Sequence, residues 1–107
     1  MASPFKASPS NFKNSLAISY QRLGNTHTAF GNLDSALTFY QAYHQLEKEL
    51  YTAYPQNVEF KNTLAISFGK VSVSILLLQE NIKTLQTKLT LNIPNELLER
   101  EYKLHYD

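Results

Sequence analysis

The chain has 107 residues, 43% of them hydrophobic, and its ten basic and nine acidic side chains give a formal net charge of +1. This length allows one small domain with a modest core, and the balanced charge argues against nucleic acid as a partner. The lack of cysteine excludes disulfides, thiol catalysis and thiolate metal sites. The N-terminal residues do not resemble a signal peptide, and we find no stretch apolar enough to span a membrane. We therefore expect a cytoplasmic protein without membrane contact.

The first ten residues predict a flexible leader. Residues 1–10 contain two Ser-Pro pairs among small side chains, and proline disfavours the helical conformation in the residue before it. Ser10 or Asn11 then stands where the N-cap of a first helix belongs.

The segment after the leader has the spacing of an amphipathic helix. Its apolar and aromatic side chains recur at steps of four and three residues, which places them on one helix face: Phe12, Leu16, Tyr20, Leu23, His27 and Phe30. We interpret His27 as a packed side chain because it belongs to this stripe. Gly31 predicts the end of the helix, and Asn32 or Asp34 is expected to cap the next one.

A second stripe at helical spacing predicts a helix that ends at Pro55. Its members and the two residues beside them are Phe39, Tyr43, Leu46, Leu50, Tyr54, Ala36 and Tyr40. Asn57 is expected to cap a third helix. Because the connections are short, neighbouring helices should run antiparallel.

The third predicted helix begins with a near copy of the first. Residues 12–20 read FKNSLAISY and residues 60–68 read FKNTLAISF, so the period is 60 − 12 = 48 residues. The same offset carries the first stripe onto another apolar set, which predicts a buried face in this helix as well: Phe60, Leu64, Phe68, Val71, Ile75 and Leu78. A period in this range is typical of stacked helical units that cannot bury their apolar faces alone.

Residues 11–56 resemble one tetratricopeptide repeat. The resemblance rests on the spacing Tyr20-x-x-Leu23-Gly24-x-x-His27 followed by Ala36-x-x-x-Tyr40. Where the family has Trp, Tyr and Phe, this chain has Tyr20, His27 and Tyr40, and the closing proline comes late, as in longer variants of the unit. The resemblance implies an all-α fold of antiparallel helix-turn-helix units, stacked as a short right-handed α-solenoid. Gly24 and Ala36 would lie where paired helices approach too closely for large side chains.

Residues 57–91 keep the first helix of a second unit and depart from the rest of the pattern. The 48-residue offset puts Gln79 in place of the turn glycine and Thr84 in place of the small alanine. No helix breaker follows, so the third helix is expected to continue into the eighties. Two explanations stay open. One is a terminal unit that has drifted into a cap. The other is a change of reading frame after about residue 70, which the coding DNA would decide.

Residues 92–107 predict a short C-terminal helix. Asn92 can cap it, and Pro94 suits its first turn. A partial apolar face would consist of Leu97, Leu98, Tyr102 and Leu104. Whether this helix covers the preceding one stays open.

Side chains able to do chemistry are few and scattered. His44 and Glu47 share a helix face, but two ligands do not make a metal site. Glu47, Glu49 and Glu59 are expected on solvated faces. The three glycines form no phosphate-binding loop, and the seven tyrosines follow the helical stripes. We expect a protein without enzymatic activity, cofactor or metal.

The resemblance implies a binding function. In tetratricopeptide proteins the first helices of successive units line a concave groove that takes a peptide or a partner helix. By register, the ligand-binding residues would be Ile18, Gln21, Asn25, Thr28, Ile66, Val73 and Leu76, with Gly69 on the same face. Family members often use an asparagine at the position of Asn25 to hydrogen-bond a ligand backbone. Members that grip a carboxylate need Lys or Arg where Gln21 stands, so the resemblance implies a protein-interaction scaffold without that specificity.

The competing interpretation is structural. The chain would be a truncated or terminal piece of a longer repeat protein that self-associates and has no independent ligand. About three repeats are normally needed for stability, and this chain supplies one and a half. A homo-oligomer in which a neighbouring helix or subunit covers Ile66, Val73 and Leu76 is therefore the alternative to a peptide ligand.

Overall fold

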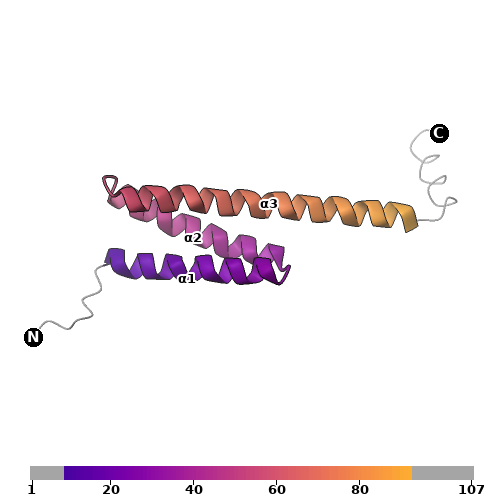
Figure 1. The fold of residues 1–107 in the computed structure, drawn as a ribbon, viewed down its shortest axis with the longest axis horizontal. Coiled ribbons are helices and arrows are strands. Elements are labelled where there is room, and N and C mark those ends of the chain that lie inside the picture. Colours follow the sequence, from indigo (N-terminus) through magenta and orange to yellow (C-terminus); the bar gives the residue numbers. More distant parts are fainter. Residues whose placement is uncertain (1–8, 93–107) are drawn as a thin grey trace, which may run out of the picture.

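The computed structural model describes residues 9–92, which form three α-helices and no strand. Helix α1 spans Pro9–Ala29, α2 spans Leu33–Ala53 and α3 spans Val58–Asn92. Helix α2 packs against both α1 and α3 and lies between them (Figure 1). This part of the chain is all-α, as predicted. The leader up to residue 8 and most of the expected helix over 92–107 lie outside the described residues.

Helix α1 begins earlier than expected. Its first residue is Pro9, so the prediction that Ser10 or Asn11 caps this helix is wrong. Proline suits the first position because its missing N–H is one that a helix start leaves without an intrahelical partner, and its φ already fits a helix.

The turn after α1 is closed by Gly31, as predicted. Its φ of 78° lies in the left-handed region that glycine adopts without steric cost. The Gly31 N–H donates to the Thr28 carbonyl at 3.0 Å, and the Asn32 N–H donates to the His27 carbonyl at 2.8 Å. These two bonds are those of a Schellman motif, which satisfies carbonyls that a helix end leaves open.

The predicted caps of α2 and α3 have different outcomes. Asn32 occupies the N-cap position of α2, but its side chain makes no capping hydrogen bond. Asp34 instead accepts the Ser35 N–H at 2.9 Å within the first turn. Before α3, the Asn57 side-chain oxygen accepts the Phe60 N–H at 3.1 Å, which confirms the predicted cap.

The core lies along α2. Ala17 of α1 and Ala36, Tyr40 and Tyr43 of α2 form its buried cluster. Gly24 is buried as well, and a Cβ built there would lie under 3.0 Å from three ring atoms of Tyr40. The prediction that Gly24 and Ala36 stand where two helices approach closely is therefore confirmed.

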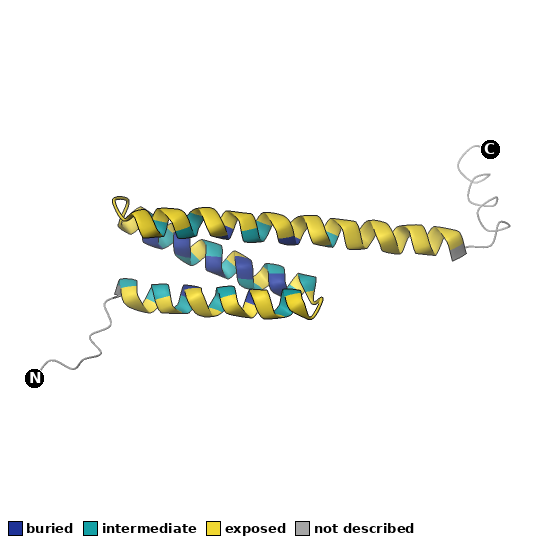
Figure 2. Ribbon diagram, in the orientation of Figure 1, coloured by how far each residue is buried: buried dark blue, intermediate teal, exposed yellow. Residues whose placement is uncertain are grey.

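The apolar stripes of α1 and α3 are only partly buried, so the prediction of two buried faces is wrong in part. The exposed members are Phe12, Leu23, Phe30, Phe68 and Ile75. The most deeply buried side chains of these helices are instead small, namely Ala17 in α1 and Ser67 and Ser74 in α3. The reason is that α1 and α3 contact α2 but not each other, which leaves one flank of each helix open (Figure 2).

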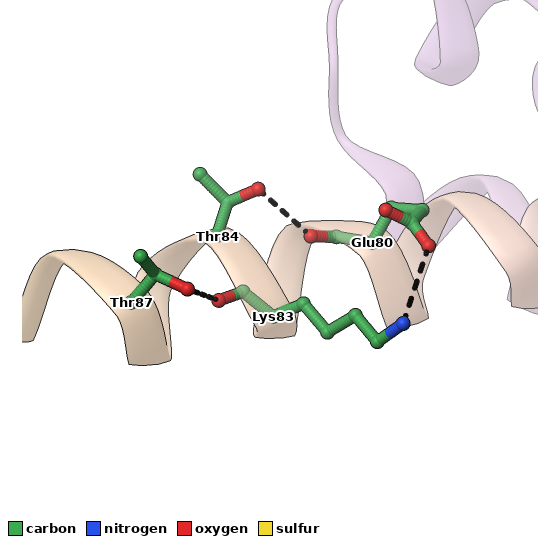
Figure 3. A network of polar contacts seen from close by, with 4 residues as sticks. All are labelled: Glu80, Lys83, Thr84 and Thr87. Atoms are coloured by element: carbon green, nitrogen blue, oxygen red, sulfur yellow. Dashed lines mark hydrogen bonds and ion pairs between the residues drawn. The ribbon is translucent and has the colours of Figure 1, made fainter. Parts of the chain in front are cut away.

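Helix α3 extends far beyond its contact with α2. It has 35 residues, and its second half projects past the ends of α1 and α2 (Figure 1). Residues 79–91 are all exposed (Figure 2). Their polar contacts stay within the helix, as Figure 3 shows for Thr84, which donates to the Glu80 carbonyl at 2.9 Å. The Lys83 ammonium lies 3.9 Å from the Glu80 carboxylate and the Lys83 carbonyl accepts from Thr87, again within one helix.

The expectation that no stretch is apolar enough to span a membrane is wrong for α3. Over Val58–Leu91 this helix is long and apolar enough to cross one, by length and composition. Core helices of soluble proteins meet the same criterion, so this property by itself is weak support for a membrane span.

Candidate functional site

A groove opens between α1 and α3, with α2 beneath it. It has a volume of about 370 Å³, and its lining is mostly apolar. The lining residues are Thr28 of α1, Tyr40 of α2, and Ile66, Gly69, Lys70, Val73, Ser74 and Leu77 of α3. The groove therefore depends on the packing of both outer helices against the central one.

Tyr40 forms the floor of the groove and is held in place by α1. Its ring packs against Gly24, and its hydroxyl donates to the Asn25 side-chain oxygen at 2.6 Å. Thr28 Oγ1 lies 3.3 Å from the same hydroxyl and donates to the Gly24 carbonyl at 2.9 Å. Asn25 and Thr28 of α1 therefore fix the position of the Tyr40 hydroxyl.

Lys70 places a positive charge beside the apolar lining. Its Nζ lies 5.8 Å from the centroid of the Tyr40 ring, within the range of a cation–π interaction. Lys70 was not among the predicted residues, because the resemblance calls for a basic side chain only at the position of Gln21. The 48-residue offset carried a usable signal, since it relates Lys70 to another basic residue, Arg22.

The groove brings together three of the predicted ligand-binding residues: Thr28, Ile66 and Val73. Gly69, which was placed on the same face, also lines it. Four predicted residues lie outside the lining: Ile18, Gln21, Asn25 and Leu76. Leu76 is 59% exposed, and its neighbour Leu77 lines the groove instead. Register predicted the correct face of α3 but not which of two adjacent leucines turns towards α1.

A polar cluster lies between α2 and α3 and consists of Tyr43, His44, Glu47, Thr63 and Ser67. Glu47 is 1% exposed, so the expectation that it is solvated is wrong. Its carboxylate accepts a hydrogen bond from the Thr63 hydroxyl at 2.6 Å. Burial raises the pKa of Glu47 above its ordinary value, the bond from Thr63 opposes this rise, and the charge of Glu59 adds to it.

Tyr43 joins the same cluster. Its hydroxyl donates to the Thr63 carbonyl at 3.3 Å. Burial raises the pKa of the Tyr43 phenol to about 12, and the charge of Glu47 contributes to the rise. Tyr43 therefore acts as a neutral donor between α2 and α3.

His44 makes the third contact of this cluster. Its Nδ1 lies 2.8 Å from Ser67 Oγ, which donates its own proton to the Leu64 carbonyl at 2.6 Å. Nδ1 must therefore carry the proton of this bond. Burial lowers the pKa of His44, and the charge of Lys48 lowers it further. His44 and Glu47 thus each hold α3, and residues 9–92 contain no group of three His, Asp or Glu side chains that could hold a metal.

No protein-family model matches the chain, and neither curated proteins nor solved structures provide a match.

Proposed function

We propose that the chain is a non-catalytic protein-interaction module that binds a peptide or a partner helix in the groove between α1 and α3. The observation that carries the proposal is an apolar groove of about 370 Å³ between two helices that begin with nearly the same sequence. Grooves of this kind take extended peptides or amphipathic helices.

The lining suggests which ligand would fit. Ile66, Val73 and Leu77 offer apolar contacts. At Gly69 an added Cβ would meet nothing within 4 Å, so a ligand can approach the helix backbone there. Lys70 favours a ligand carbonyl or carboxylate at the edge of the groove. We therefore expect a peptide with apolar side chains and at least one acceptor or acidic group.

Selection from a random peptide library on the immobilised chain tests the proposal. The enriched peptides should carry apolar residues, and titration of one of them should give saturable binding. Val73→Glu puts a charge into the groove at a position that is 54% exposed, so this variant should fold and should bind at least about tenfold more weakly.

Leu91→Glu is the matched control because Leu91 is 79% exposed on the same helix and lies outside the groove. It should leave peptide binding unchanged. Enrichment of no peptide, or an equal loss of binding in both variants, would contradict the proposal.

We also propose that the three helices are part of a right-handed α-solenoid of tetratricopeptide type. Two arguments support this. The near-identical segments of α1 and α3 lie on opposite sides of α2, as successive first helices would. In addition, Tyr20 and His27 of α1 contact Phe39 of α2 through their rings, at centroid distances of 6.1 and 5.3 Å, as the paired helices of one unit would.

A second candidate function is that of a terminal piece of a longer repeat array. The 48-residue offset relates Tyr20 and His27 to Phe68 and Ile75, which are 55% and 40% exposed. In α1 this face packs against α2 through both rings, whereas in α3 Phe68 keeps a ring contact with His44 of α2, at 4.3 Å between centroids, and more than half of its surface stays exposed. The open face therefore supports the idea that α3 accepts another helix like α2.

A chain in which residues 77–101 are replaced by residues 29–53 tests this second candidate. The replacement supplies a copy of α2 in the register of the first unit. It should raise the midpoint of urea unfolding, because Phe68 and Ile75 become buried. An unchanged or lower midpoint would speak against the terminal-piece interpretation, and it would leave the peptide proposal to its own test.

A further inference from the structure

Helix α3 carries a continuous apolar seam with the spacing of a coiled coil. Its members follow one another at alternating steps of four and three residues: Leu64, Phe68, Val71, Ile75, Leu78, Ile82, Leu85 and Leu89. This is the a/d pattern of a heptad repeat, sustained over nearly four heptads of one unbroken helix. We call these eight residues the α3 seam.

Most of the α3 seam is open to solvent. Its five exposed members are Phe68, Ile75, Ile82, Leu85 and Leu89, with exposed fractions of 55, 40, 54, 58 and 64%. The other three members are half-buried, and Val71 among them packs against the core cluster. The exposed Phe68 ring also contacts the His44 ring of α2, at 4.3 Å between centroids. The seam is therefore continuous with the α2–α3 interface and runs from it onto the projecting half of α3.

Residues 93–107 of the same chain are too short to cover this seam. At a rise of 1.5 Å per residue the seam measures about 38 Å, whereas a helix of fifteen residues would cover only about 22 Å of it. At best they would cover the projecting part and would leave Phe68 and Ile75 open.

The outer flank of α1 is also a poor partner for the seam. By the 48-residue offset, the α3 residues that face α2 correspond to Ser15, Ser19, Arg22 and Thr26 of α1, all of them exposed and polar. A head-to-tail contact would place this polar flank on the apolar seam. The exposed apolar stripe of α1 runs only from Phe12 to Phe30. Among the described residues, an apolar seam of the full length is provided by α3 of a second copy.

We infer that two copies of the chain pair through their α3 seams as an antiparallel coiled coil. With the two-fold axis between residues 76 and 77, every layer joins an a to a d residue. The four kinds of layer join Leu64 to Leu89, Phe68 to Leu85, Val71 to Ile82, and Ile75 to Leu78 of the second copy. Such an interface is isologous and closes on itself.

The antiparallel direction follows from where α2 lies. Helix α2 flanks the first half of α3, and nothing among the described residues flanks 79–91 (Figure 1). Antiparallel pairing places the unflanked half of each copy beside the flanked half of the other. A parallel pair would crowd both α2 helices at one end of the coiled coil.

The residues that border the seam do not oppose self-pairing. They are Ala65, Ser67, Ser72, Ser74, Gln79, Asn81, Gln86 and Lys88. Lys88 alone is charged, and in the antiparallel register it faces the first half of the second copy, where the bordering residues are neutral. Like-charge repulsion, which normally selects against a wrong partner in coiled coils, is therefore absent here.

Pairing through the seam does not depend on peptide binding. Ile66, Gly69, Val73 and Leu77 of the groove belong to another face of α3. If the chain is a terminal repeat piece that self-associates, the α3 seam is the surface through which two copies would pair. A chain that does not pair in this way could still bind a peptide in the groove.

Light scattering after size exclusion, over a range of concentrations of the full chain, tests the inference. The chain should be dimeric at high concentration and dissociate on dilution. Leu85→Glu should weaken the dimer by more than about tenfold, because the layer with Phe68 would bury a charge. Leu91→Glu, off the seam and 79% exposed, should leave the dimer unchanged.

Disulfide mapping tests the direction of pairing, since the chain has no cysteine of its own. A mixture of Phe68→Cys and Leu85→Cys chains should form the mixed disulfide under mild oxidation. Leu85→Cys alone should form little or none, because residue 85 of one copy is far from residue 85 of the other. A faster crosslink in Leu85→Cys alone would overturn the antiparallel pairing.

Three further outcomes would overturn the inference. The first is a chain that stays monomeric up to its solubility limit. The second is an equal loss of association in Leu85→Glu and Leu91→Glu, which would indicate unspecific contacts. The third is capture of the chain by neutral phosphatidylcholine vesicles without dimer formation in their absence.

Discussion

Helix α2 packs against α1 mainly through small and aromatic side chains, whereas its contact with α3 adds buried hydrogen bonds to the packing of Val71 and Phe68. On the α1 side, Ala17 and Gly24 let the Tyr40 ring approach the helix backbone. On the α3 side, Glu47 contacts Thr63 and His44 contacts Ser67 through polar atoms. The first interface depends on shape and the second on the pairing of buried polar groups, although the same central helix makes both.

Helices α1 and α3 begin with nearly the same sequence but bury different residues against α2. Ser19 of α1 is exposed, whereas its equivalent Ser67 in α3 is fully buried. Tyr20 packs on Phe39, whereas its equivalent Phe68 is 55% exposed. The two helices present opposite flanks to α2, so nearly identical local sequence does not decide which face is covered.

The largest expected effect is at the shape-dependent interface. Tyr40→Ala should lower the free energy of unfolding by about 3–5 kcal/mol, because it removes a buried ring that neighbouring side chains cannot replace. Urea unfolding at a concentration where the chain is monomeric measures this. Tyr40→Phe, which loses only the contacts of the hydroxyl with Asn25 and Thr28, should cost about 1 kcal/mol. Similar losses in the two variants would show that polar contacts, not shape, hold α1 to α2.

A matched pair of glycines gives the next largest effect. Gly24→Ala should cost about 1–3 kcal/mol, since the added methyl overlaps the Tyr40 ring. Gly69→Ala, where a Cβ meets nothing within 4 Å, should instead stabilise the chain by about 0.5–1 kcal/mol through helix propensity. Thermal unfolding followed by circular dichroism compares them. An increase in stability in both variants would mean that α1 and α2 are not closely packed at Gly24.

The hydrogen-bonded interface should respond to pH through Glu47. Its pKa is raised on folding, so the folded state holds the proton more tightly than the unfolded state. That contribution to stability is fully present below the ordinary value of 4.5 and is lost as pH rises through the raised pKa. Glu47→Gln stays neutral, so its stability relative to the wild type should increase as pH rises above 4.5 and should level off above the raised pKa of Glu47.

Urea unfolding of both proteins across this range checks the prediction. His44 titrates in both, and its lowered pKa has the opposite effect, with stability lost as pH falls below 6.5. The difference between the free energies of unfolding of the two proteins at each pH therefore reports the titration of Glu47 alone. A difference that does not change with pH would show that Glu47 is solvated in the folded chain.

The smallest effect is expected for the exposed ion pair that joins α1 to α2. Lys13 Nζ lies 3.4 Å from the Glu49 carboxylate, and both side chains are more than a third exposed. Lys13→Ala should cost less than about 1 kcal/mol, and the cost should vanish in high salt. A cost that persists in high salt would mean that charge contributes to an interface we attribute to shape.

Several features of the fold follow from local sequence. Gly31 ends α1, Asn57 caps α3 and Pro55 follows the end of α2, because turns and caps depend on the backbone chemistry of single residues. The small side chains of Gly24 and Ala36 indicated close packing for the same kind of reason. The uninterrupted course of α3 into the eighties followed from the lack of any breaker.

The groove was predictable only in part. The periodicity of α3 indicated a common face for Ile66, Gly69 and Val73, and the structure places all three in the lining. Lys70 and Leu77 were missed because their inclusion depends on how α3 is rotated against α2. That rotation follows from the bonds of Thr63 and Ser67 to α2, which no periodicity contains.

The sequence by itself determined the all-α character of residues 9–92, the glycine turn after α1, the Asn57 cap of α3 and part of the face of α3 that lines the groove, because these depend on neighbours along the backbone. Only the tertiary structure decided that Glu47 is buried and that Phe68 and Ile75 are open. Burial depends on which helix lies beside each face. Glu47 lies against α3, whereas Phe68 lies at the edge of the α2–α3 contact, where only one side of its ring meets His44, and Ile75 stays 40% exposed.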